Sequence, residues 1–207
     1  MLTAVLLELE GVLVETAEAR AAALAQALAD EGVRDAARLA ALDETGRDLV
    51  TLRARRHFAA RVAGGVALVP GAPAALERLA ARVPVGVVTR ATRREADLLL
   101  GGTPLRDLVA FVITADDAPA KPSPAAYTLA RHRLQARLGG RAADGVVALE
   151  DSGPGIDAAA AAGLAVVAVG TVPAHEALRA AGSIDSLAEL TVDQLERVAG
   201  LVSGHPA

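Results

Sequence analysis

Cysteine and tryptophan are absent from this chain of 207 residues, and its aromatic side chains are only two Phe and one Tyr. Without cysteine the protein has no disulfide framework, no thiolate nucleophile and no cysteine-bound zinc. The apolar residues, 53% of the chain, are therefore mainly alanine, leucine and valine. We expect a closely packed core of small side chains, and the length suits one medium-sized domain or a core with a small inserted unit.

Long apolar segments and a strong charge of one sign are also missing. The longest unbroken apolar run, residues 158–170, is shorter than the roughly 20 residues of a membrane-spanning helix. The amino terminus has no basic region and Glu8 interrupts its apolar stretch, which does not fit a secretory signal. A formal net charge of -4 offers no basic face to nucleic acid. We expect a cytoplasmic protein that binds neither membranes nor nucleic acid.

The amino-terminal segment carries the first chemical signal. An apolar run of strand length leads into Glu8 and Glu10, and Gly11 follows at once. Because side chains alternate along a strand, the two carboxylates are expected on the same side and close together. Such a pair is tolerated if it is solvated, if one member is protonated, or if a cation lies between the two. Gly11 allows a sharp turn and leaves room for a ligand.

The rest of the chain changes from a helical pattern to helices and strands in alternation. Spacing and terminal glycines predict helices over residues 17–31, 34–42 and 47–62. From residue 69 onward, apolar runs alternate with amphipathic helices, which predicts a parallel sheet covered on both faces. The expected strands are 83–89, 109–114, 146–149 and 164–169, and the expected helices are 73–82, 93–100, 124–138 and 156–162. Ser123 is expected to cap one helix, and Thr191 with Gln194 to form a capping box at the last.

Polar residues follow the ends of several of these strands. In a parallel sheet such ends meet at one edge, where ligands bind. The residues concerned are Glu8, Glu10, Thr89, Lys121 after its loop, Glu150 and Asp151. Lys121 is the only lysine in a chain that otherwise uses arginine. A lysine is favoured where a compact point charge fits beside carboxylate and phosphate.

These segments, in this order, resemble the four motifs of the haloacid dehalogenase (HAD) superfamily, in its beta-phosphoglucomutase and phosphoglycolate phosphatase branch. The first motif has glutamate at positions 8 and 10, where the family has aspartate. The resemblance extends over most of the chain outside the helical insert. The matching segments are Glu8-Leu9-Glu10-Gly11, Val87-Val88-Thr89, Lys121-Pro122 and Glu150-Asp151-Ser152-Gly153-Pro154-Gly155.

The resemblance implies an α/β fold, a Rossmann-like parallel sheet covered by helices on both faces, formed by residues 1–16 and 69–207, with a small all-helical cap at 17–68. It implies a phosphatase or phosphomutase that acts on a small phosphorylated metabolite and uses Mg2+. Glu8 would be the attacking carboxylate and Glu10 the general acid and base. Thr89 and Lys121 would contact the phosphoryl group. The implied Mg2+ ligands are Glu8, Glu10, Glu150 and Asp151.

A substrate-binding role is expected for Gly11 and for three arginines. Arg53 and Arg56 are three residues apart in the expected cap, so one of them could meet the distal anionic group of a substrate; a solvated helix face is the alternative. Arg90 follows Thr89 where this branch has a small polar residue. It could bind substrate, or pair with one of the first-motif glutamates in place of Mg2+.

Two functions stay open at this point. Each glutamate extends its carboxylate by about 1 Å relative to aspartate, and a misplacement of about 1 Å can cost around a hundredfold in rate. The chain is therefore either a HAD-like hydrolase or a HAD-like protein without turnover that acts by binding a ligand or partner. The substrate and the oligomeric state, monomer or dimer, are left open by the sequence. Gly153-Pro154-Gly155 also matches a loose dinucleotide fingerprint, but no acidic ribose ligand follows the next strand.

Overall fold

The structure is a computed structural model that describes residues 1–33, 39, 42–139 and 144–203, with side chains described up to residue 200. The helix expected over 34–42 falls almost entirely outside these residues. The chain forms two compact units. The core unit comprises Met1–Val14 and Leu68–Ala207, and the helical unit comprises Glu15–Ala67.

The core unit is built on a six-stranded parallel sheet with strand order β3-β2-β1-β4-β5-β6, which confirms the α/β fold. The strands are β1 (Ala4–Leu7), β2 (Val85–Val88), β3 (Phe111–Ile113), β4 (Val146–Glu150), β5 (Ala165–Val169) and β6 (Gly182–Ile184). Chain order reverses between β1 and β4, so a crevice for ligands is expected at their carboxyl ends. The sequence did not predict β6, because this short edge strand is only partly buried and has no apolar run.

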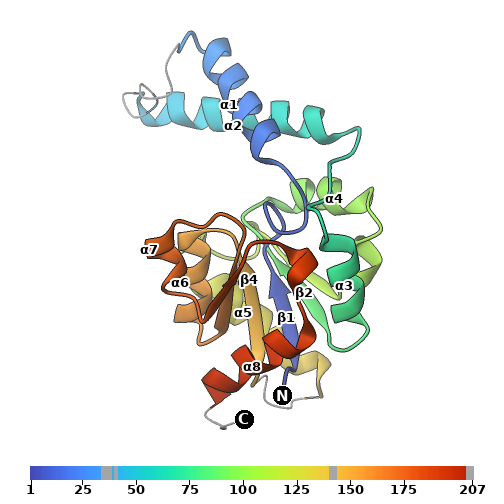
Figure 1. Cartoon of the computed structure of the whole chain (residues 1–207). Coiled ribbons are helices and arrows are strands. Elements are labelled where there is room, and N and C mark those ends of the chain that lie inside the picture. Colours follow the sequence, from blue (N-terminus) through green and yellow to red (C-terminus); the bar gives the residue numbers. More distant parts are fainter. Residues whose placement is uncertain (34–38, 40–41, 140–143, 204–207) are drawn as a thin grey trace. The chain divides into compact units, whose positions relative to one another are not determined.

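Helices cover both faces of the sheet (Figure 1). On one face α5 (Ala125–Arg137) and α6 (Gly153–Ala161) share a buried cluster with the strands. On the other face α3 (Ala72–Ala80) contacts β2, and α8 (Val192–Ser203) contacts β4 and β5. The remaining elements are α4 (Arg93–Gly101), α7 (Ala174–Ala177) and the 3-10 turns η2 (Arg106–Leu108) and η3 (Leu187–Glu189).

The helix starts follow local capping. At α8 the expected capping box is confirmed, since the Thr191 N–H donates to Gln194 Oε1 (2.7 Å) and the Gln194 N–H to Thr191 Oγ1 (3.2 Å). Helix α6 begins earlier than predicted, because the Ser152 hydroxyl accepts from the Gly155 N–H at 3.3 Å. The residue directly before α5 is Pro124, which has helical backbone angles and no side chain that can cap the helix. The expected contribution of Ser123 is a long hydrogen bond, in which its hydroxyl accepts from the Ala125 N–H at 3.4 Å.

The helical unit pairs α1 (Ala17–Asp30) with α2 (Glu44–Val62). Their interface buries apolar side chains of both helices. A hydrogen bond and an ion pair connect α2 to the end of α1: His57 Nε2 lies 2.7 Å from Asp30 Oδ2, and Arg53 Nε lies 2.5 Å from Oε1 of Glu31, the residue after α1. Helix α2 begins three residues before the predicted start, because the Asp43 carboxylate caps it by accepting from the Gly46 N–H at 2.7 Å.

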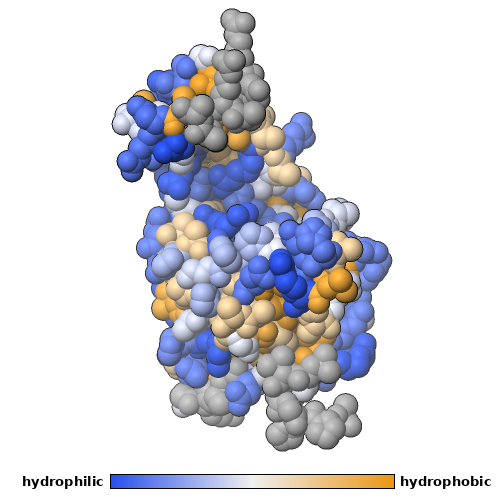
Figure 2. Space-filling view, turned by 90° about the vertical axis from the view of Figure 1, so that its left-hand side faces the viewer, coloured by the Kyte–Doolittle hydropathy of each residue, from blue (hydrophilic) through white to orange (hydrophobic). Residues whose placement is uncertain are grey.

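No helix in the described part of the chain is long and apolar enough to cross a membrane. Figure 2 shows polar residues over much of one face of the molecule, with smaller apolar patches among them. Among the large apolar side chains, Leu52 and Leu178 are well exposed.

Candidate active site

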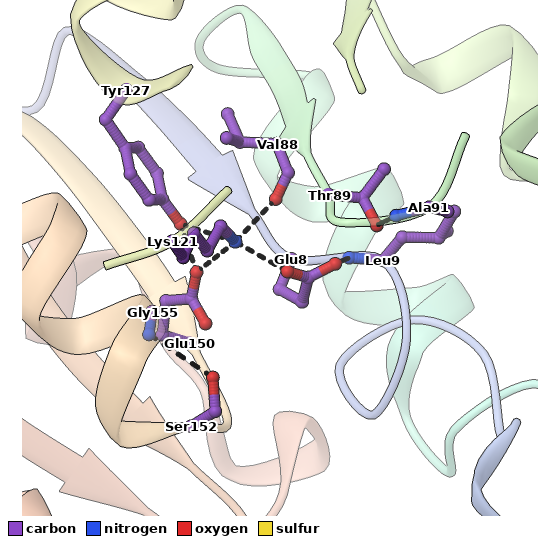
Figure 3. A network of polar contacts seen from close by, with 10 residues as sticks. All are labelled: Glu8, Leu9, Val88, Thr89, Ala91, Lys121, Tyr127, Glu150, Ser152 and Gly155. Carbon is purple, nitrogen blue, oxygen red and sulfur yellow. Dashed lines mark hydrogen bonds and ion pairs between the residues drawn. The ribbon is translucent and has the colours of Figure 1, made fainter. Parts of the chain in front are cut away.

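The ammonium group of Lys121 lies at the carboxyl edge of the sheet, between two carboxylates from neighbouring strands (Figure 3). Its Nζ is 2.5 Å from Glu8 Oε2 and 2.5 Å from Glu150 Oε1. It also donates to the carbonyl of Val88, the last residue of β2, at 2.8 Å. All three side chains are buried. The three protons of the ammonium thus match three acceptors.

Glu8 is held at the switch point of the sheet. It follows Leu7, the last residue of β1, and its N–H donates to the carbonyl of Leu149 in β4 at 3.0 Å. Its second carboxylate oxygen accepts from the Leu9 N–H at 2.9 Å. The expectation that Glu8 and Glu10 leave one regular strand together was wrong, because β1 ends before both of them. Glu10 is partly exposed, and its backbone forms an isolated bridge with Val14.

Glu150, the last residue of β4, is fully buried. Its Oε2 has no hydrogen-bond partner among the described residues. The carboxylate lies against Gly155, where a Cβ atom would come within 1.9 Å of Oε2. The second glycine of the Gly-Pro-Gly segment is therefore explained by close approach to this carboxylate, and the sequence reasoning had not assigned it a role.

Tyr127 is a site residue that sequence reasoning missed. Its hydroxyl donates to Glu150 Oε1 and lies 3.5 Å from Lys121 Nζ (Figure 3). The residue is fully buried on α5, in the cluster that joins this helix to the sheet. An aromatic residue on the buried face of a helix is normally interpreted as a core residue, and Tyr127 does lie in the core. The available signal was that the chain's single tyrosine stands six residues after its single lysine.

Gly11 and Asp151 approach each other closely. Gly11 has a φ of +78°, and a Cβ atom there would lie 2.0 Å from Asp151 Oδ2. The space that Gly11 was expected to leave for a ligand is thus bordered by an acidic side chain. A larger residue at this position would be strained and would displace the Asp151 carboxylate.

Thr89 and Arg90 follow β2 and differ in their surroundings. Thr89 is buried, and its Oγ1 accepts from the Ala91 N–H at 3.1 Å, which closes the turn after the strand. Arg90 is exposed, and its charge is near enough to Asp151 to act against the rise in the pKa of that carboxyl. The cation in contact with Glu8 is Lys121. Pairing of Arg90 with a first-motif glutamate in place of Mg2+ stays a prediction.

Burial dominates the electrostatics of the two fourth-motif carboxyls. It raises the pKa of Glu150 to about 7, although the charge of Lys121 opposes the shift. Burial, followed by the charge of Glu8, raises the pKa of Asp151 to about 6. For Lys121 burial lowers the pKa, but the charges of Glu8 and Glu150 outweigh it, so the net shift is upward. The site thus holds more acidic groups than one ammonium neutralises.

A divalent cation would suit this excess of carboxylate, and carboxylate oxygens are the ligands that Mg2+ prefers. The partnerless Oε2 of Glu150 is a buried donor atom of that kind. Among the described residues, however, no three acidic or histidine side chains are already gathered into a metal-binding group. Ligation of Mg2+ by Glu8, Glu10, Glu150 and Asp151 therefore stays a prediction.

The arginines expected to contact substrate from the insert lie on α2 of the helical unit. Both arginines are exposed, and Arg53 is already paired with Glu31 and, at 3.7 Å, with Asp30. Hydrogen bonding by His57 holds the pKa of Asp30 below its usual range. Contact of Arg53 or Arg56 with a substrate stays a prediction, and the ion pairs of Arg53 leave Arg56 as the more available of the two.

Residues 2–163 match the family model of the haloacid dehalogenase-like hydrolases. The chain belongs to this family. None of the curated proteins compared with this HAD-like chain matches it.

Solved structures of this family are similar to the HAD-like chain over nearly their whole length. CbbY from Rhodobacter sphaeroides, in complex with phosphate, is 26% identical, with a TM-score of 0.77, and the match covers 95% of this chain and 100% of that one. Beta-phosphoglucomutase from Clostridium difficile is 16% identical (TM-score 0.76, 99% and 100% covered). A predicted phosphoglycolate phosphatase from Haemophilus somnus is 19% identical (TM-score 0.74, 91% and 96% covered). The last two likenesses concern the fold alone.

Proposed function

We propose that this HAD-like hydrolase is a magnesium-dependent phosphatase or phosphomutase that acts on a small phosphorylated metabolite. The observation that carries the proposal is the buried Glu8–Lys121 pair at the switch point of the sheet. A carboxylate fixed beside a cation is what in-line phosphoryl transfer requires of a nucleophile. The similar CbbY was crystallised with phosphate and, as a point mutant, with xylulose-(1,5)bisphosphate, which supports a phosphorylated metabolite as the ligand class.

The chemistry proposed for the first step is nucleophilic. A carboxylate oxygen of Glu8 attacks phosphorus, the bond from phosphorus to the ester oxygen breaks, and Glu10 gives a proton to the departing alcohol. Water then attacks the phosphorus of the resulting acyl phosphate, and Glu10 accepts its proton. The bond from phosphorus to Glu8 breaks, which releases orthophosphate and restores the carboxylate.

Lys121 acts in this scheme chiefly by its charge. Its three protons are already engaged by Glu8, Val88 and Glu150, so contact with a phosphoryl oxygen requires one of these bonds to be given up. Thr89 and the neighbouring Arg90 are the proposed donors to the phosphoryl group, because both follow β2 at the same edge of the sheet. Gly11 would line the same site beside Asp151.

The residues proposed to hold Mg2+ are Asp151 and Glu150, with Glu8 and Glu10 completing the expected set. The partnerless Oε2 of Glu150 and the raised pKa values of Glu150 and Asp151 support this choice. When bound, Mg2+ would spread the negative charge of the phosphoryl oxygens. The helical unit would act as the cap, with Arg56 or Arg53 meeting a distal anionic group.

A second candidate is a non-catalytic HAD-like protein that binds a phosphorylated ligand or a partner. Two observations favour it. Positions 8 and 10 are glutamates, and the three ammonium protons of Lys121 are already donated to Glu8, Val88 and Glu150. Both candidates place the ligand at the same site, so turnover distinguishes them.

The test is phosphate release from a panel of small phosphomonoesters with and without Mg2+. We expect Mg2+-dependent release by the natural protein and at least a hundredfold loss in Glu8→Gln, while Glu77→Gln, at an exposed glutamate of α3, keeps full activity. A silent natural protein whose Glu8→Asp/Glu10→Asp variant releases phosphate would instead establish the non-catalytic candidate.

A further inference from the structure

The hydroxyl of Tyr127 contacts the candidate site, yet the proposed chemistry gives it no part. The side chain is fully buried, and packing alone does not require the oxygen, since phenylalanine has nearly the same shape. The hydroxyl donates to Glu150 Oε1 and is 3.5 Å from Lys121 Nζ. Tyr127 is the only tyrosine of the chain, and its hydroxyl contacts Glu150, which is paired with the only lysine, Lys121.

The carboxylate of Glu150 depends on this hydroxyl for its orientation. Among the described residues its hydrogen-bond donors are Lys121 and Tyr127, and both address Oε1. Oε2 has no partner in the described part of the chain, and Gly155 presents no side chain to it. Two donors on one oxygen, one from the loop before α5 and one from α5 itself, fix the rotation of the carboxylate. With the Tyr127 donor removed, Lys121 alone would hold Oε1, and the orientation of the carboxylate would be less firmly fixed.

The orientation of Glu150 is passed on to Glu8 through Lys121. The same Nζ atom lies 2.5 Å from both carboxylates. A rotation of Glu150 therefore moves the ammonium, and with it the charge that faces the proposed nucleophile. Misplacing a group in such a site by about 1 Å can reduce the rate by around a hundredfold.

We propose that Tyr127 is a positioning residue: its hydroxyl fixes the Glu150 carboxylate and thereby holds Lys121 in place against Glu8. This inference rests on the proposed function, since the position of Lys121 affects a rate only if Glu8 reacts. Tyr127 itself touches neither substrate nor reacting atoms in this arrangement.

The first test is Tyr127→Phe, which removes the oxygen and keeps the ring. We expect kcat for phosphate release to fall about 10- to 100-fold, the effect common for groups that orient a ligand or reactant, with KM changed less than about twofold. The matched control is Thr114→Val. It removes an equally buried hydroxyl that donates to a carboxylate, Asp117 Oδ2 at 2.8 Å, and it should leave kcat unchanged.

A second readout separates positioning from a merely structural role. Because the chain has one tyrosine and no tryptophan, its near-ultraviolet absorbance reports mainly on Tyr127. Inorganic orthophosphate added with Mg2+ should perturb the Glu8, Lys121 and Glu150 chain and change the tyrosine band saturably. Thr114→Val should show the same change.

The two proposals fail in different ways. A tyrosine band that ignores orthophosphate, or a normal kcat in Tyr127→Phe beside an active natural protein, would overturn the positioning role and leave the proposed function standing. A natural protein that releases no phosphate from any ester would overturn the proposed function, and the positioning role with it.

Discussion

Removal of the Lys121 ammonium should expose the electrostatic balance of the site. In Lys121→Met the buried carboxylates of Glu8 and Glu150 lose the cation that lies 2.5 Å from each. Breaking a buried ion pair by removing one partner costs about 3–5 kcal/mol of stability, because it leaves charge buried without compensation. We therefore expect the free energy of unfolding to fall by about this amount at pH 8. The matched control is Arg179→Met, whose exposed pair with Asp157 at 2.9 Å should be worth less than about 1 kcal/mol.

The pH dependence of this loss gives a sharper test. In the natural protein the raised pKa of Lys121 keeps the ammonium charged between pH 5 and 8, whereas its partner Glu150, with a pKa of about 7, takes up a proton within this range. In the variant the charge that opposes the rise in the pKa of Glu150 is gone, so burial raises this pKa further and Glu150 becomes neutral as the pH falls. The stability difference should therefore shrink from pH 8 to pH 5. Urea unfolding followed by circular dichroism measures it. A loss below about 1 kcal/mol, or one that is the same at both pH values, would show that Lys121 does not compensate the buried carboxylates.

Three further predictions follow from the contacts around Glu150. Gly155→Ala places a Cβ 1.9 Å from Glu150 Oε2 and should lower the free energy of unfolding by about 1–3 kcal/mol, as measured by thermal denaturation. The control Gly101→Ala, where a Cβ would have no atom within 4 Å, should be neutral or slightly stabilising. Equal effects of the two substitutions would contradict the close packing of Gly155 against Glu150. Ser152→Ala removes the N-cap of α6 and should cost about 1 kcal/mol by the same method, and no loss would show that the cap is dispensable. The affinity for Mg2+, measured by calorimetry, should fall as the pH drops from 8 to 5.5, because carboxyls with a pKa of about 7 (Glu150) and about 6 (Asp151) take up protons that the ion must displace; a flat profile would remove these two ligands.

The fold was predictable because most of its strands are continuous runs of apolar residues in the sequence. The buried strands β1, β4 and β5 are short segments rich in alanine, leucine and valine, and no other element explains such segments at that spacing. Strand β6 escaped prediction because its Gly182–Ile184 run is partly exposed and contains no repeated apolar residue. The starts of α2 and α6 were each missed by three residues, because the side chains of Asp43 and Ser152 cap these helices before their apolar pattern begins.

The site was predictable only as a set of strand ends. Topology brings Glu8, Lys121 and Glu150 to one edge, which the sequence indicated. The pairing of Lys121 with both Glu8 and Glu150 depends on the directions of their side chains, which the periodicity of the sequence does not predict. The contribution of Tyr127 was hidden because an aromatic side chain on a buried helix face satisfies the packing pattern whether or not its hydroxyl has a partner.

The central claim, that Glu8 is the nucleophile, is tested most directly by trapping the acyl phosphate. The protein would be mixed with Mg2+ and a phosphomonoester that it hydrolyses, and the reaction would be quenched in acid within milliseconds. The protein would then be digested, and its amino-terminal peptide would be sequenced by mass spectrometry. Cleavage after Arg20 releases one peptide that carries Glu8, Glu10, Glu15 and Glu18 together. We predict a single phosphoryl group on Glu8, which is absent in Glu8→Gln. A phosphoryl group on Glu10, Glu15 or Glu18, or turnover with no phosphorylated peptide, would contradict it.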